Sequence, residues 1–353
     1  MTGSEKTIII LTPGFAKDEA DSTCIPTQQN FVRALKKVYP QLNIIILALD
    51  YPYSTKKYQW YNNTVISFNG KNQGGLSKLL LRRRVLSVLK EIHGSKKIIG
   101  LLSFWYTECA LIGKKFADKN GLKHICWICG QDAKKGNKNV RRLRLMANEL
   151  TGLSDFLQDE FEKNYNIKPQ YVITPGINTE QFRDEIQSKD IDIIGAGSLI
   201  PLKQYEIFVN VIAETKKQMP RVKAVLTGDG PEKNKLEALI TKNELQLNII
   251  LAGELPHAEV LQMMQRAKIF LHPSSYEGFS VVCLEALYAG CQVISFCKPM
   301  KQDIENWHVA DSAKTMIERT AMILQEPKMI YKKVIPFEIN ATVEKMMQLF
   351  DSK

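Results

Sequence analysis

The segment KIFLHPSSYEGFSVVCLEALYAGCQVISF, residues 268–296, indicates how this 353-residue chain folds. It opens with a short apolar run at 268–271 and closes with another at 291–296, and both read as buried strands. Between them, residues 281–289 have a helical composition and follow Ser280, a residue type suited to capping a helix start. A strand, a helix and a second apolar strand in this order predict a parallel βαβ unit.

The same alternation continues along the chain on both sides of this segment. In the first half, strands are predicted at 7–12, 43–49, 97–102, 124–129 and in a run ending at Gly176, and helices at 26–38, 76–92 and 106–119. In the second half, strands are predicted at 191–195, 222–227 and 248–252, and helices at 204–218, 231–243 and 257–266. Continuous apolar strands alternating with helices are typical of parallel sheets covered on both faces. The sequence therefore predicts an α/β protein with two Rossmann-like, doubly wound parallel-sheet domains.

The domain boundaries follow from length and from one polar stretch. A chain of 353 residues exceeds one ordinary hydrophobic core, so two domains are expected. The polar stretch at 184–190 separates the two series of strands and is the predicted linker. We expect an N-terminal domain over 1–183 and a C-terminal domain over 191–335. A last helix within 336–353 is expected to pack back on the N-terminal domain.

Composition points to a cytoplasmic protein. Residues 1–18 lack the features of a signal peptide, and no apolar run approaches the roughly 20 residues that span a bilayer. The seven cysteines are an odd number in mostly apolar surroundings, which favours reduced thiols over disulfides. Cys126 and Cys129 form a CxxC pair, but they lie in an apparent strand that points them to opposite faces, and no second CxxC completes a zinc site.

Positive charge is concentrated in one part of the chain. Residues 51–150 hold 20 lysines and arginines against 5 acids, a net charge of +15, so the rest of the chain sums to −4. Such an excess predicts a polyanionic partner, and an anionic membrane surface or a phosphate-bearing acceptor fits best. Nucleic acid is disfavoured because no reader motif accompanies the charge. The predicted anion-binding or membrane-binding patch comprises Arg82, Arg83, Arg84, Lys134, Lys135, Arg141 and Arg142.

Three glycine-containing turns follow predicted strands of the second half, where ligands of open α/β sheets bind. They are centred on Gly197, Gly228 with Gly230, and Gly278. The dinucleotide motif G-x-G-x-x-G is not completed at either of the first two turns, because Ile200 and Lys233 stand at its last position. This disfavours an NAD-dependent or FAD-dependent oxidoreductase.

The third turn carries two acids, Glu277 before the predicted helix and Glu285 one turn into it. Backbone N–H groups at 279–282 would form an anion site at the helix start. A carboxylate beside bound phosphate would repel it, so Glu285 is expected to face vicinal hydroxyls such as those of a ribose, and Glu277 those of a sugar. The alternative is that both are solvated glutamates flanking a turn. His272, just before this turn, is either a hydrogen-bonded structural residue or a ligand contact.

These residues carry a family resemblance. The stretch SSYEGFSVVCLEALYAGCQVIS (274–295) resembles the E-x7-E signature of the retaining GT-B glycosyltransferases of family 4. Three further segments are similar to segments of that family in the same order along the chain: 152–182, GAGSLIPLKQYEIFVNVI (195–212) and VLTGDGPEKNKLEALI (225–240).

The resemblance implies a GT-B fold, two Rossmann-like domains facing each other across a cleft, and retention of anomeric configuration. A nucleotide-diphosphate sugar would bind mainly to the C-terminal domain, with Glu285 at the ribose and Glu277 at the donor sugar. Lys203 would neutralise the diphosphate as it leaves, so that neither a metal nor a further cofactor is needed. The implied donor-binding residues are Gly197, Ser198, Lys203, Gly228, Gly230, Glu277, Gly278, Phe279, Ser280 and Glu285.

The chain also departs from the family pattern. Ser198 stands where the family often has an arginine, and Cys129 where many members have a histidine at the cleft. Asp132 lies nearby and is the candidate acceptor-side catalytic group, while Gly14 replaces the usual glycine pair after the first strand. After Pro299 the chain lacks the family's usual glycine-containing turn.

A second acidic pair suggests metal binding at first sight. Asp190 and Asp192 form the D-x-D pattern of metal-dependent transferases. Because the two acids open a strand, alternation across the pleat accounts for them.

Taken together, the sequence pattern and the family resemblance imply a metal-independent retaining hexosyltransferase at the inner face of the membrane. Its acceptor would be a lipid-linked or cell-surface polysaccharide intermediate. The alternatives are a degenerate GT-B protein with a binding or scaffold role, and a GT-B nucleotide-sugar epimerase.

Overall fold

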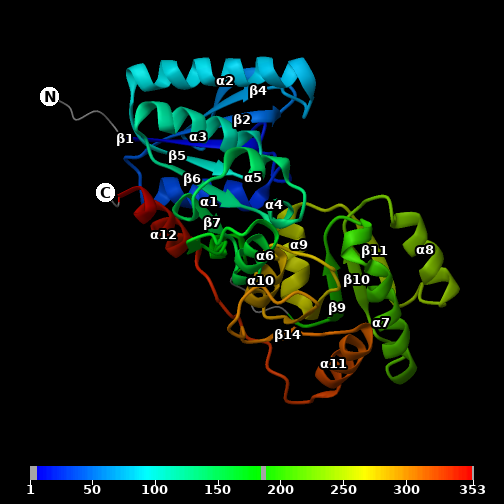
Figure 1. Ribbon diagram of the computed structural model, residues 1–353. Coiled ribbons are helices and arrows are strands. Elements are labelled where there is room, and N and C mark those ends of the chain that lie inside the picture. The colour runs from blue at the N-terminus through cyan, green and yellow to red at the C-terminus, as the bar shows by residue number, and fades with distance from the viewer. Residues whose placement is uncertain (1–5, 184–187, 352–353) are drawn as a thin grey trace. The chain divides into compact units, whose positions relative to one another are not determined.

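The computed structural model describes residues 6–183 and 188–351, which form two compact units (Figure 1). The boundaries between the units fall between Gly176 and Ile177 and between Pro336 and Phe337. The first boundary lies a few residues before the predicted end of the N-terminal domain at 183. Of the predicted linker, residues 184–187 lie outside the described residues.

The first unit is built on an eight-stranded sheet in which only the edge strand β3 runs antiparallel to its neighbour. In spatial order the strands are β3 (Thr55–Trp60), β4 (Asn63–Phe68), β2 (Asn43–Tyr51), β1 (Lys6–Gly14), β5 (Lys97–Phe104), β6 (His124–Ile128), β7 (Leu150–Gly152) and β8 (Tyr171–Val172). The central strand β1 pairs with β2 and with β5 and is buried along nearly all its length. A continuous apolar run such as IIIL is stable there because helices cover both faces of the sheet.

Helices follow the strands of the first unit in alternation. They are α1 (Pro26–Val38), α2 (Gly75–Ser95), α3 (Glu108–Asn120), α4 (Gly130–Ala133), α5 (Lys138–Leu143), α6 (Asp155–Tyr165) and α12 (Ile339–Asp351). α2 buries a stripe at helical spacing that consists of Leu81, Val85, Leu89 and Ile92. Its remaining faces carry the arginines and lysines that the sequence made conspicuous.

The C-terminal helix α12 belongs to the first unit. It packs against α1, and its Val343, Met346 and Phe350 join the core cluster that includes Phe31. Gly100 of β5 makes room for it, since a methyl group there would lie 2.3 Å from Phe350 Cδ1. The last helix therefore completes a core whose other members lie more than 160 residues earlier in the chain.

The second unit contains a six-stranded parallel sheet. In spatial order its strands are β11 (Ile249–Gly253), β10 (Ala224–Thr227), β9 (Ile191–Ala196), β12 (Ala267–His272), β13 (Gln292–Ser295) and β14 (Trp307–Val309). Its helices are α7 (Tyr205–Gln218), α8 (Lys233–Lys242), α9 (His257–Arg266), α10 (Val281–Tyr288) and α11 (Ala313–Gln325). The strand order places β9 and β12 side by side in register, so their carboxyl ends are neighbours.

The structure corrects the predicted element list in several places. The hairpin of β3 and β4 was not expected, because β3 (TKKYQW) is a polar, mostly exposed edge strand with lysines that protect the sheet edge. The strand predicted to end at Gly176 ends at Val172 instead. Helices α5, α6 and α11 and the short strands β7 and β14 also lie in segments for which no element was predicted.

Within the described parts of the chain, no helix is long and apolar enough to cross a membrane.

Candidate functional site

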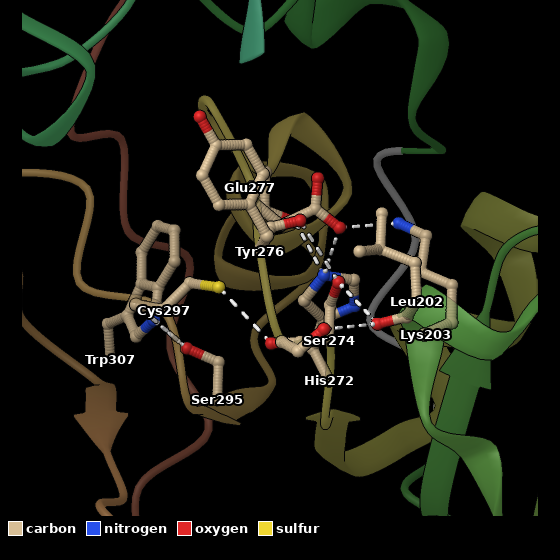
Figure 2. A network of polar contacts seen from close by, with 11 residues as sticks. Leu202, Lys203, His272, Ser274, Tyr276, Glu277, Ser295, Cys297 and Trp307 are labelled. Carbon is tan, nitrogen blue, oxygen red and sulfur yellow. Dashed lines mark hydrogen bonds and ion pairs between the residues drawn. The ribbon is translucent and has the colours of Figure 1, made fainter. Parts of the chain in front are cut away.

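The centre of the candidate site is an ion pair between two loops of the second unit. Lys203 ends the short 3₁₀ turn Pro201–Lys203 after β9, and Glu277 lies in the loop after β12. Lys203 Nζ donates to Glu277 Oε1 over 2.6 Å (Figure 2). Both side chains are largely but not fully buried, with 18% and 17% of their surface exposed. The pair thus lies at the carboxyl ends of adjacent parallel strands, where open α/β sheets bind ligands.

His272, the last residue of β12, also contacts Glu277. Its Nε2 is 3.1 Å from Glu277 Oε1 and 3.2 Å from Ser280 Oγ. Figure 2 shows His272 and Lys203 both directed toward the Glu277 carboxylate. The imidazole is fully buried and lies roughly parallel to the Phe270 ring. Of the two interpretations of His272, the hydrogen-bonded structural residue agrees with this burial.

These contacts determine the charge of Glu277. Burial by itself raises its pKa, but the hydrogen bond from His272 and the positive charge of Lys203 outweigh burial and hold the pKa at about 2. Burial lowers the pKa of His272, against the opposing hydrogen bond to Glu277. Glu277 is therefore a carboxylate across the physiological pH range, and it cannot act as a proton donor there.

Backbone contacts fix the two loops against each other. The Ser275 N–H and the Ser274 hydroxyl both donate to the Leu202 carbonyl, over 3.0 and 3.3 Å. The Cys297 thiol donates to the Ser274 carbonyl over 3.2 Å (Figure 2). The spacing of Lys203 from Glu277 thus also depends on the hydrogen bonds that Ser274 and Ser275 make to the Leu202 carbonyl.

Glu285 has a different partner. It lies on α10, and its Oε1 is 2.9 Å from Nε2 of His257, the first residue of α9. The hydrogen bond to Glu285 raises the pKa of His257. Glu277 and Glu285 therefore do not share a proton. His257 was not anticipated, because nothing near it in the sequence indicates a partner 28 residues away.

The loop around Ser280 differs in one detail from expectation. Ser280 occupies the N-cap position of α10, but its hydroxyl makes no capping bond and contacts His272 instead. The Phe279 ring is buried and packs edge-to-face on Trp307. Any contact that Phe279 makes with a ligand would therefore come from its backbone, as for Gly278.

The first two glycine turns are packed against each other. A methyl group at Gly228, whose φ is +134°, would lie 1.9 Å from the Gly197 carbonyl oxygen. One at Gly230 would lie 2.6 Å from the Leu199 carbonyl oxygen. These two glycines thus let the turn after β10 approach the turn after β9. Ser198 is exposed on that turn, and Gly197 lies next to the Tyr205 hydroxyl and the end of Lys203.

The residues predicted for the acceptor side all lie in the first unit. Gly14 ends β1, next to Tyr51. Cys129 and Asp132 are buried, and Asp132 Oδ2 accepts a hydrogen bond from the Cys129 N–H over 2.8 Å at the start of α4. Burial raises the pKa of Asp132 to about 7. Cys126, like Cys129, is a buried free thiol, with no disulfide.

The predicted basic patch is divided by the structure. Arg82 forms a salt bridge with the nearly buried Glu108, and Arg84 donates to the Phe68 carbonyl over 2.9 Å, so both arginines are engaged by the fold. Lys134 is half-buried. The exposed members of the patch are Arg83, Arg84, Lys135, Arg141 and Arg142, although Arg84 also makes the hydrogen bond to Phe68.

The D-x-D acids are also paired. Asp190 forms a salt bridge with Arg266 and Asp192 with Lys268. No group of three or more potential metal ligands was found among the residues that the structure describes.

The segment that carries this geometry resembles known proteins. Residues 176–316 match the family model of the glycosyl transferases group 1. The matched segment contains Lys203, Glu277, Glu285 and both histidines of the site. It lies almost entirely within the second unit.

Curated relatives match part of the chain. The gpi3 subunit of phosphatidylinositol N-acetylglucosaminyltransferase from Schizosaccharomyces pombe is 35% identical over 133 residues, which are 37% of this chain and 29% of that protein. The GtfA subunit of the UDP-N-acetylglucosamine–peptide N-acetylglucosaminyltransferase of Streptococcus pneumoniae is 26% identical over 171 residues, 47% of this chain and 33% of that one. The chain thus spans about a third of the length of these relatives.

Solved structures extend the likeness of the fold to the whole chain. Sucrose-phosphate synthase from Thermosynechococcus elongatus superposes with a TM-score of 0.74 over 98% of both chains at 15% identity. The pneumococcal O-GlcNAc transferase GtfA, solved with UDP and GlcNAc, superposes with a TM-score of 0.67 over 99% of both chains at 12% identity. The structure thus has the GT-B fold, as the sequence predicted.

Proposed function

We propose that this protein is a retaining hexosyltransferase that transfers a sugar from a nucleoside diphosphate sugar to an acceptor. The observation that carries the proposal is the Lys203–Glu277–His272 network at the carboxyl ends of β9 and β12, with Glu285 held separately by His257. A single partly buried cation beside a permanent carboxylate suits a ligand that bears both phosphates and hydroxyls.

The charges of Lys203, Glu277 and Glu285 suggest which part of the donor each one would contact. Lys203 would turn from Glu277 to the diphosphate and neutralise the negative charge that develops on the leaving nucleoside diphosphate. Glu277, released from Lys203 but still bonded to His272, would accept hydrogen bonds from hydroxyls of the donor sugar. Glu285 would accept those of the ribose. Because Lys203 supplies the positive charge, we propose that no metal ion is required, and activity in excess EDTA should equal untreated activity.

The relatives suggest which donor to test first. Both curated relatives carry N-acetylglucosaminyltransferase in their names, and one names UDP-N-acetylglucosamine. We therefore propose UDP-N-acetylglucosamine as the first donor candidate, before other UDP, GDP and ADP sugars.

For the acceptor we propose a lipid-linked or cell-surface polysaccharide intermediate, met by a peripheral protein at the inner face of a membrane. Two observations support this: the charge of +15 over residues 51–150 and a relative whose name specifies phosphatidylinositol. Asp132 stays our candidate for the acceptor-side group, because its pKa of about 7 would let it accept a proton at neutral pH.

A donor screen tests the proposal. Thermal unfolding is measured with UDP, GDP and ADP and their sugars, and one nucleotide series should raise the melting temperature. Glu285→Ala and Lys203→Ala should then lose most transferase activity while staying folded. If no nucleotide raised the melting temperature at millimolar concentration, the protein would be a degenerate member with a binding role. Donor consumption without an acceptor product would indicate an epimerase.

A further inference from the structure

A groove of about 660 Å³ lies in the first unit on helices α2, α3 and α5. These helices are neighbours: α2 packs beside α3, and α3 beside α5 (Figure 1). The apolar residues that line the groove are Leu79, Leu86, Leu111, Ile112 and Leu143. The charged residues that line it are Arg82, Arg83, Lys114, Lys115, Asp118 and Arg142. An apolar floor is thus bordered by five cations and a single acid.

The cations fall into two groups. Arg82 is bonded to Glu108, and Lys114 forms salt bridges with Asp118 and Glu149. The Arg82 pair joins α2 to α3, and the Glu149 pair joins α3 to the turn before β7, so both cations are engaged by the fold.

Arg83, Lys115 and Arg142 form the second group, and all three are exposed. Among the described residues, none of the three has a carboxylate within salt-bridge distance. Their charge is therefore available to an anion outside the protein.

Exposed leucines continue the groove at the start of α2. Leu76, Leu79 and Leu80 are 80%, 42% and 57% exposed. They occupy positions i, i+3 and i+4, so they share one face of the helix, and Arg83 follows on that face at i+7. Single exposed leucines are ordinary on a protein surface, but three adjoining ones beside free cations indicate an interaction site.

We propose that this surface, formed by the groove and by Leu76, Leu79 and Leu80, docks on an anionic phospholipid bilayer. The leucines would enter the boundary between headgroups and acyl chains, and Arg83, Lys115 and Arg142 would meet the headgroup phosphates. A flat polyanion would use the cations but would leave the leucines in water, and an uncharged apolar partner would leave the cations unpaired. A membrane uses both, so the observations favour it.

The position of the surface agrees with the lipid-linked acceptor, on which this inference rests. α2 and α3 follow the parallel strands β4 and β5, so each begins near the carboxyl ends of the sheet and runs back along it. The exposed leucines lie in the first two turns of α2, and α5 follows β6 at that same end. Gly14, Cys129 and Asp132 also lie at the carboxyl ends of their strands. A bilayer docked here would present a lipid acceptor to that end of the first unit.

Vesicle sedimentation of the full chain tests the inference. The vesicles contain phosphatidylcholine alone or with phosphatidylglycerol, at low and at high salt. Arg83→Glu with Lys115→Glu removes the free cations, and Leu76→Ser with Leu80→Ser removes the most exposed apolar groups. Arg221→Glu with Lys242→Glu makes the same change of charge at exposed positions of the second unit and is the matched control.

We expect the wild type to bind the phosphatidylglycerol vesicles and not the neutral ones. The groove charge variant should partition onto these vesicles at least ~10-fold less than the wild type, because each cation near an anionic membrane surface strengthens binding and the variant reverses two of them. The leucine variant should lose most of the binding that persists at high salt, and the control should keep wild-type binding.

Three results would overturn the inference: equal binding to neutral vesicles, a control that loses as much as the groove charge variant, or leucine variants that bind normally. The last, together with competition by soluble polyphosphate, would indicate a polyanion instead of a bilayer. The nucleotide-induced change in melting temperature is measured in every variant. A variant that loses vesicle binding but keeps this change in melting temperature still binds the donor nucleotide. Failure of the docking proposal is thereby distinguished from failure of the proposed function.

Discussion

Glu277 and Glu285 lie eight residues apart but have different electrostatic environments. Glu277 is bonded to Lys203 and to a buried His272, whereas Glu285 is bonded to His257 at the start of another helix. Two carboxylates that shared a proton would need to be each other's neighbours, and these have separate cationic or donor partners. The E-x7-E spacing therefore positions two independent acceptors of hydrogen bonds, one in the loop after β12 and one on α10.

Glu277→Gln should have opposite effects on nucleotide binding and on turnover. In the ligand-free protein the carboxylate neutralises Lys203, so its removal frees the lysine and also removes a negative charge near the proposed diphosphate site. We expect UDP, or whichever nucleotide binds, to bind several-fold more tightly by calorimetry. Turnover should fall by about 10²-fold, in the range found when a preorganised transition-state contact is lost.

Glu285→Gln is the matched control for this experiment, because it removes a carboxylate that is not paired with Lys203. It should weaken nucleotide binding. If Glu277→Gln weakened binding to the same degree, Lys203 would not be the residue that holds the phosphates.

His257→Gln should change how stability depends on pH. The hydrogen bond to Glu285 raises the pKa of His257 in the folded protein. Its stabilising contribution is therefore fully present below the unfolded histidine pKa of about 6.5, and it is lost as the pH rises through the folded pKa. The wild type should exceed the variant in melting temperature at about pH 5.5, and the difference should shrink toward about pH 9.

The double variant His257→Gln with Glu285→Gln provides the control. With no carboxylate at position 285, the residue at position 257 should no longer affect this pH dependence. A constant difference between wild type and His257→Gln at all pH values would contradict the ion pair.

Sequence predicted part of this site and missed another part for a physical reason. Spacing and residue type indicated Glu277 and Glu285 as candidate site residues, and the family resemblance indicated Lys203. Their partners could not be found this way, because His257 and Lys203 reach the two glutamates from other helices and turns. The same holds for Arg82, whose charge was assigned to a surface patch although Glu108, 26 residues later, pairs with it.

At the scale of elements, the second unit depends on how closely two turns approach. The turns after β9 and β10 are joined by backbone bonds, from Gly197 N–H to the Thr227 carbonyl and from Leu199 N–H to the Asp229 carbonyl. This approach leaves no space for a side chain at Gly228. The turn that carries Lys203 is therefore positioned by a neighbouring turn as well as by its own strand.

Gly228→Ala should destabilise the second unit much more than Gly253→Ala. Both glycines have positive φ, +134° and +73°, but a methyl group at Gly253 meets nothing within 4 Å, whereas one at Gly228 meets the Gly197 carbonyl oxygen. Gly253→Ala should cost about 1 kcal/mol of backbone strain, and Gly228→Ala at least about 3 kcal/mol. Urea unfolding measures both values. Similar costs would mean that the turns can separate freely.

Elements were predictable where burial dictated composition. The apolar runs that form β1, β2, β5 and β9 were predicted correctly, because a strand buried on both faces needs apolar residues at nearly every position. The edge strand β3 was not, because an exposed strand with alternating polar residues has no such signature. Short elements such as β7 and β14 gain their strand geometry from pairing with a neighbour, which local sequence does not encode.

At the scale of the whole molecule, the last helix of the chain follows the second unit in sequence but belongs to the first unit. α12 packs on α1 and contributes Met346, fully buried, to the core of the first unit. The first unit is therefore complete only when α12 is in place. Damage to α12 should consequently appear in the first unit and not in the second.

Met346→Ala should lower the free energy of unfolding of the first unit by about 2–5 kcal/mol, the usual cost of a buried large-to-small change. Met322→Ala is the control, because Met322 is 61% exposed on α11 and should change stability by less than about 0.5 kcal/mol. Tryptophan fluorescence in urea separates the units, since Trp60, Trp105 and Trp127 lie in the first and Trp307 in the second. With Trp307 replaced by Phe, the signal reports the first unit alone, and its midpoint should fall for Met346→Ala only. A midpoint unchanged by Met346→Ala would mean that α12 adds nothing to the first core, although it is buried there.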